Sequence, residues 1–119
     1  MRPRRAVPRE LAEQVALASR LDRAGLLWCH VPNGGRRGRR EAVALQASGV
    51  KAGVPDVLIF TPPPAGGVGV ALELKAIDGA AAPEQRQWLA RLHVCGWATV
   101  VVYGVDDAVA QLRMLGYVL

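Results

Sequence analysis

Residues 70–75 read VALELK, an apolar strand pattern that contains two charges, Glu73 and Lys75. Side chains two residues apart on a strand point to the same face, so Glu73 and Lys75 share one face and the neighbouring leucines pack on the other. An unpaired charge inside an apolar strand is energetically costly. The stretch therefore predicts a buried strand whose two charges have a specific role.

A second apolar run also opens with a charge, because residues 56–60 read DVLIF and begin with Asp56. Asp is a common turn residue, and a turn must precede a strand. A short loop rich in Pro and Gly separates this run from the VALELK strand, which favours a hairpin. Pairing within the hairpin would bring Asp56 close to Glu73 and Lys75.

The rest of the chain predicts helices and strands around this hairpin. Apolar residues recur at helical spacing near the N-terminus, and a later helix has Pro at its start and Gly at its end. The predicted order is helix 9–24, strand 26–31, weak helix 36–49, strand 56–60, strand 68–75, helix 83–96, strand 98–104 and helix 106–116. This α-β-(α)-β-β-α-β-α order predicts an α/β fold with a mixed four-stranded sheet flanked by helices.

Two runs, 57–60 and 98–102, are apolar on both faces, so we expect them to be central strands. The chain has 119 residues, of which 51% are hydrophobic. It should form one domain with a modest core. We expect a basic N-terminal arm over residues 1–8 and a single domain over residues 9–119.

Composition bears on the compartment. No stretch is apolar enough to cross a membrane, and the basic N-terminus lacks the apolar segment of a secretory signal. Cys29 and Cys95 lie far apart in apolar surroundings. We expect buried thiols of a cytoplasmic protein rather than a disulfide framework or a zinc site.

The positive charge is unevenly distributed. Residues 1–51 carry eleven Lys and Arg against four Asp and Glu, whereas residues 52–119 carry four against six. A basic half beside a mildly acidic half suggests a polyanion-binding surface next to a cation site. The competing explanation is that the arginines reflect only a GC-rich genome.

The predicted convergence of Asp56 and Glu73 points to a metal ion. Two nearby carboxylates repel each other unless one is protonated or a cation bridges them. Mg²⁺ or Mn²⁺, which prefer oxygen ligands, would resolve the conflict. Such an ion activates water and stabilises charge on a phosphate, with Lys75 assisting. The alternative is a plain ion pair of Lys75 with one carboxylate, and spacing alone leaves both open.

Three motifs together resemble a known family. They are GVPD at residues 53–56, ELK at 73–75, and PEQ at 83–85 opening a helix with Trp88 and Leu89. The combination, over roughly residues 10–104, resembles the VRR-NUC family of PD-(D/E)xK nucleases, which is related to Holliday-junction resolvases. The small size is similar to stand-alone phage and bacterial members.

The resemblance implies a restriction-endonuclease-like core and a set of site residues. It implies that the metal ligands are Asp56, Glu73 and the Leu74 carbonyl, and that Lys75 is catalytic. It also implies that Gln85 completes the catalytic set by orienting Lys75 or a phosphate.

The resemblance further implies an acidic metal ligand from the first helix, for which Glu10 and Glu13 compete. The apolar stripe of this helix is centred nearer Glu10. We therefore expect Glu10 to face the sheet and Glu13 to lean towards solvent. The alternative is that both are ordinary first-turn acids, favoured by the helix dipole.

The basic segment before Asp56 is the candidate DNA-binding surface. It offers phosphate contacts from Arg36, Arg37, Arg39, Arg40 and, nearer the hairpin, Lys51. The alternative is a solvated loop. His30, at a predicted strand end, is expected to be structural rather than a general base.

The sequence thus predicts a metal-dependent DNA endonuclease, selective for branched or junction DNA. The family resemblance implies a homodimer, because junction cutting needs paired active sites. We expect no nucleotide cofactor and a location in a bacterial or phage-infected cytoplasm. A non-catalytic nucleic-acid-binding module with the same fold is the main alternative. A small-molecule enzyme is disfavoured by the basic half and by the lack of a cofactor motif.

Overall fold

The computed structural model describes residues 9–32 and 38–119. The predicted arm over residues 1–8 lies outside them. The elements are α1 (Arg9–Arg23), β1 (Trp28–His30), α2 (Arg39–Ala47), β2 (Val57–Ile59), β3 (Gly69–Leu74), α3 (Pro83–Val94), β4 (Trp97–Val102) and α4 (Val105–Met114). This is the predicted order.

The four strands form one mixed sheet in the order β1-β2-β3-β4. The first three are antiparallel, and the register places Val57 opposite Leu72. β4 runs parallel to β3 because α3 carries the chain across, as a parallel connection requires. The predicted hairpin and mixed sheet are therefore confirmed.

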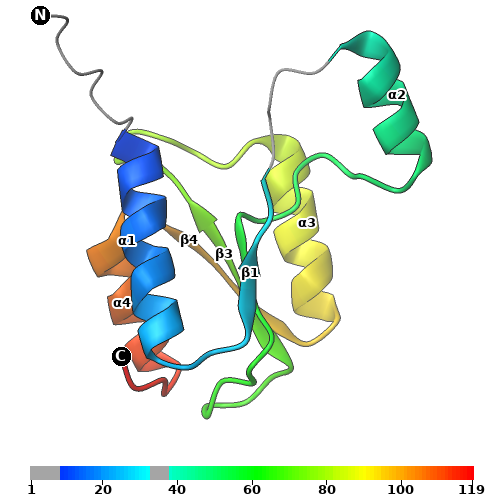
Figure 1. The fold of residues 1–119 in the computed structure, drawn as a ribbon. Helices are drawn as coiled ribbons and strands as arrows, with labels where there is room; N and C mark the ends of the chain where they lie inside the picture. Colours follow the sequence, from blue (N-terminus) through cyan, green and yellow to red (C-terminus); the bar gives the residue numbers. More distant parts are fainter. Residues whose placement is uncertain (1–8, 33–37) are drawn as a thin grey trace, which may run out of the picture.

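Helices cover both faces of the sheet. α1 and α4 lie together on one face and α3 lies on the other (Figure 1). The core cluster lies on the α1 and α4 side and contains Leu17, Leu21, Val57, Ile59, Val70, Leu72, Leu74, Val102, Ala108, Leu112 and Tyr117. Since side chains alternate along a strand, Glu73 points to the α3 side.

One strand lies elsewhere than expected. β4 is at the edge of the sheet rather than at its centre, and residues 97–101 are only half-buried. Its apolar residues are explained by its helical neighbours, because β4 contacts both α3 and α4. The apolar pattern of β4 therefore reflects the helices that cover both of its faces, not a central position in the sheet.

The predicted burial of the two thiols is wrong. Cys29 lies on the edge strand β1, and Cys95 follows the last residue of α3, so both are exposed and free. None of the helices in the described ranges has the length and apolarity to cross a membrane.

α2 differs from the other helices. It projects away from the sheet (Figure 1), and none of its nine residues is buried. Its first turn carries Arg39 and Arg40, and Val43 is 59% exposed. A helix this short is marginal in water without packing.

Candidate active site

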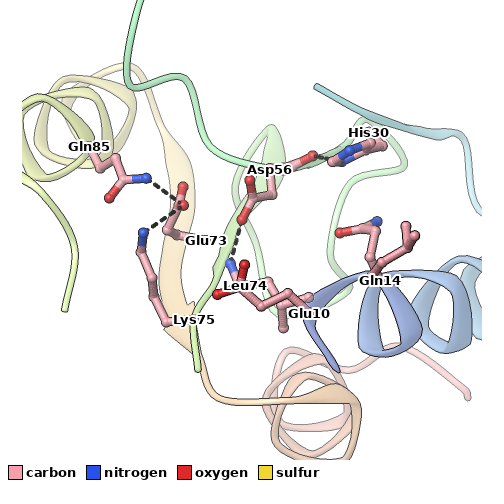
Figure 2. Close-up of a pocket in the computed structure, with 9 residues that line it drawn as sticks. Glu10, Gln14, His30, Asp56, Glu73, Leu74, Lys75 and Gln85 are labelled. Atoms are coloured by element: carbon pink, nitrogen blue, oxygen red, sulfur yellow. Dashed lines mark hydrogen bonds and ion pairs between the residues drawn. The ribbon is translucent and has the colours of Figure 1, made fainter. Parts of the chain in front are cut away.

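A cavity of about 310 Å³ opens beside the C-terminal end of β3 and the first turns of α1 and α3 (Figure 2). Two strand ends and two helix starts supply its walls. The residues that line it are Glu10, Leu11, Gln14, His30, Asp56, Glu73, Leu74, Lys75 and Gln85. All the residues of the ELK motif, together with Asp56 and Gln85, thus lie on one cavity.

Asp56 is held in place from both sides. Continuing the β2–β3 register by one residue places Asp56 opposite Glu73. The Asp56 Oδ2 accepts a hydrogen bond from the Leu74 N–H at 2.9 Å. Its main-chain carbonyl accepts from the Val31 N–H at 2.7 Å and lies 2.8 Å from the His30 Nδ1. The carboxylate is therefore fixed towards Glu73.

Pro55 gives the Leu74 carbonyl a special position in the sheet. The same register, continued to the next pair, places buried Pro55 opposite Leu74. The Leu74 N–H points towards Asp56, and its carbonyl points the same way, as in any strand. Pro55 has no N–H to donate. The Leu74 carbonyl therefore has no ladder donor from the opposite residue and can serve as an oxygen ligand.

Glu73 is buried with one oxygen held and the other free. The residue is 1% exposed. The Oε1 accepts a hydrogen bond from the Gln85 Nε2 at 2.8 Å and lies 3.6 Å from the Lys75 Nζ. Within the described part of the chain, the buried Oε2 has no hydrogen-bond partner. Burial, and then the charge of Asp56, raises the pKa of Glu73 to about 7.

Gln85 acts on Glu73 rather than on Lys75. At the start of α3, its Oε1 accepts a hydrogen bond from the Ala82 N–H at 2.7 Å, which leaves the Nε2 to donate to Glu73. In the reverse orientation the amide oxygen of Gln85 would face the Glu73 Oε1, so the two hydrogen bonds together fix one orientation of the amide. The structure thus gives Gln85 a different partner from the predicted Lys75 or phosphate.

The two acids of α1 have different environments. Glu10 lines the cavity, as expected. Glu13 does not lean towards solvent, because it is half-buried and its Oε2 accepts from the Val105 N–H at 2.7 Å. The first N–H groups of α4 lack helical acceptors, and Glu13 satisfies one of them.

These positions fit a hard divalent cation. The Glu73 Oε2 is buried and has no hydrogen-bond partner among the described residues. Asp56 lies opposite Glu73, and Leu74 is the next residue along β3. In residues 9–32 and 38–119, no three Asp, Glu, His or Cys side chains converge as metal ligands. Two carboxylates and one carbonyl nevertheless suit Mg²⁺, which retains several waters and needs few carboxylates.

Sequence reasoning missed two polar residues of the cavity. His30 was expected to be structural, and its Nδ1 does face the Asp56 carbonyl. A carbonyl only accepts, so the Nδ1 carries the hydrogen and the Nε2 remains an acceptor when the ring is neutral. Gln14 lies four residues after Glu10, hence on the same helix face, and its buried Nε2 has no hydrogen-bond partner among described residues. That spacing was the signal that could have found Gln14.

Three of the predicted DNA-binding residues lie outside this cavity. Arg39 and Arg40 are exposed at the start of α2, and Lys51 is exposed in the following loop. Arg36 and Arg37 fall outside the described residues.

Comparison with known proteins bears on both the fold and the family. The model of the VRR-NUC domain matches residues 8–106. One solved structure, described as a VRR-NUC domain protein, is 23% identical with a TM-score of 0.74, over 93% of this chain and 90% of that one. A second, described as a VRR-NUC domain, is 20% identical with a TM-score of 0.58, over 92% and 95%. No functionally curated protein matches significantly.

Proposed function

Because the chain belongs to the VRR-NUC domain family, a nuclease-type family, we propose that it is a metal-dependent DNA endonuclease that hydrolyses phosphodiester bonds. One observation carries the proposal. Glu73 is buried opposite Asp56, its Oε2 has no hydrogen-bond partner in the part of the chain that the structure describes, and the ammonium of Lys75 lies beside it. Two carboxylates this close need a proton or a cation between them. A cation that keeps a coordination position free could bind water or a phosphate there, so the carboxylate pair would serve catalysis.

We assign the metal ligands from the oxygen atoms around the cavity. Asp56, the Glu73 Oε2 and the Leu74 carbonyl would hold Mg²⁺ or Mn²⁺, with Glu10 adding charge from α1. A bound divalent ion supplies an acidified water and compensates charge that builds on the phosphate. Gln85 holds the Glu73 Oε1 and so would leave the Oε2 available to a metal ion.

Lys75 is assigned to the phosphate. Its Nζ lies 3.6 Å from the Glu73 Oε1 and its side chain is 21% exposed, so it is tethered but accessible to substrate. An ammonium held beside the reacting phosphate stabilises the charge that develops in the transition state. The positive charge of Lys75 also lowers the pKa of Glu73 and so partly offsets the effects of burial and of Asp56.

The substrate that we propose is DNA, with a preference for branched or junction structures. The segment that precedes Asp56 in the sequence carries three exposed cations, Arg39, Arg40 and Lys51. The same basic segment includes Arg36 and Arg37. We further propose a homodimer, since cutting a junction requires paired active sites. A bacterial or phage-infected cytoplasm remains the predicted location.

Cleavage assays test this function. Labelled duplex, flap and four-way-junction DNA are incubated with the protein in Mg²⁺, Mn²⁺ or EDTA. We expect cleavage with either metal, strongest on a branched substrate, and none in EDTA. Binding without cleavage under every metal condition would favour the non-catalytic nucleic-acid-binding module. Cleavage in EDTA would refute the metal dependence.

A further inference from the structure

A second cavity, of about 530 Å³, lies along α3. Its residues are Lys51, Ala52, Trp88, Arg91, Leu92 and Cys95. Trp88 and Leu92 are half-buried, whereas Lys51 and Arg91 are exposed. The floor is thus partly apolar, and the charged side chains among these six are both cations. We call this cavity the α3 groove.

The α3 groove and the candidate active site lie along the same helix. Trp88 follows Gln85 by three residues, so both lie on one face of α3. On the opposite wall, Lys51 and Ala52 precede Asp56 by only a few residues. The groove and the active-site cavity therefore both take residues from α3 and from the segment that leads to Asp56.

The two walls are fixed to each other. The Trp88 Nε1 donates a hydrogen bond to the Ala52 carbonyl at 2.9 Å. Gly53 has a φ of +87°, and a Cβ there would lie 2.7 Å from the main-chain carbon of Glu84. Only glycine allows so close an approach in this conformation. The groove is therefore preformed, and the contacts that form it also position the loop leading to Asp56.

We propose that the α3 groove binds the sugar-phosphate backbone of the DNA strand on one side of the scissile phosphate, with Lys51 and Arg91 contacting phosphates. The proposal rests on the nuclease function above. Among described residues, neither cation has a hydrogen-bond or ion-pair partner for its side chain, so both are available to phosphate oxygens. Arg91 follows Gln85 by six residues, about 9 Å along the helix. That is the rise of roughly three base pairs.

The test combines a double variant with substrates of different length. Lys51→Ala/Arg91→Ala is compared with Arg23→Ala/Arg113→Ala, which removes the same charge near the far ends of α1 and α4. Both pairs are made in a Lys75→Ala background, so that DNA stays uncut in Mn²⁺. Binding is measured on the DNA that the parent cleaves best, and on versions trimmed to one nucleotide beyond the scissile phosphate on either side.

On full-length DNA we expect the groove variant to bind more weakly than the control. A plot of the logarithm of the DNA association constant against the logarithm of the salt concentration should be less steep for the groove variant by about two, because each lost phosphate contact removes about 0.9 from the slope. Between 50 and 200 mM salt the groove variant should therefore lose roughly tenfold less affinity than the control. On one of the two trimmed substrates the difference between the variants should vanish.

Two results would overturn the proposal while leaving the nuclease function intact. One is equal DNA binding by the groove variant and the control, which would assign the groove to another anionic partner, such as an acidic protein segment. The other is weaker binding by the groove variant than by the control on both trimmed substrates. That result would mean that Lys51 and Arg91 act only through the overall electrostatic potential of the protein. A parent that neither binds nor cleaves DNA would instead refute the nuclease function.

Discussion

The buried carboxylate of Glu73 should make metal-free protein less stable as pH rises. Burial and the charge of Asp56 raise the pKa of Glu73 from 4.5 to about 7. The folded state then holds a proton that the unfolded state has released, so stability falls between about pH 4.5 and pH 7. A shift of this size corresponds to on the order of 3 kcal/mol.

Glu73→Gln removes this dependence and nearly preserves the shape of the side chain. The Gln oxygen can still accept from Gln85, and its amide nitrogen can face Asp56. In EDTA at pH 5, the free energies of unfolding of the variant and the parent should differ little. At pH 8 the variant should be more stable by on the order of 3 kcal/mol, or roughly 10 °C in melting temperature for a domain of this size.

Thermal melts at pH 5 and pH 8 in EDTA measure this effect. Glu84→Gln is the matched control, since Glu84 is an exposed carboxylate on the same side of the sheet. Its melting temperature should follow that of the parent at both pH values. If Glu73→Gln is no more stable than the parent at pH 8, the carboxylates are not under electrostatic strain and the argument for a cation there is lost.

Other predictions concern the metal and the basic segment. Asp56→Asn should melt at the same or a higher temperature than the parent in EDTA, because the amide oxygen can still accept from the Leu74 N–H and the repulsion is gone. Mn²⁺ at a hundredfold excess over its Kd should stabilise the parent by about 2.7 kcal/mol and the Asn variant by much less. An equal rise in the melting temperatures of both proteins on addition of Mn²⁺ would contradict the ligand assignment. Alanine substitution of the four arginines of the basic segment should weaken DNA binding and make its salt dependence less steep. The substituted residues are Arg36, Arg37, Arg39 and Arg40. An unchanged slope of affinity against salt in a titration would place the DNA surface elsewhere.

Local sequence patterns predicted the parts of the site that depend on strand register. Alternation along residues 70–75 separated Glu73 from the core, and a short loop predicted the hairpin that places Asp56 opposite it. Both follow from the two-residue period of a strand and from contacts close in sequence.

The parts that sequence did not predict depend on contacts between distant segments. Glu13 bonds the Val105 N–H, 92 residues away, so the periodicity of α1 could not reveal its partner. β4 was expected to be central because helices on both sides impose the same apolar pattern as neighbouring strands. Gln85 bonds Glu73 through the position of α3 on the sheet, which no spacing within α3 encodes.

Single-turnover cleavage by the parent and by Lys75→Met tests the central claim most directly. The substrate is a labelled DNA in Mn²⁺, at protein concentrations that saturate binding for both proteins. The account predicts product from the parent and at least about a hundredfold slower cleavage by Lys75→Met, the scale of losing one transition-state stabiliser, with DNA affinity largely kept. Cleavage by Lys75→Met at the parental rate, or no product from the parent in Mn²⁺, would contradict it.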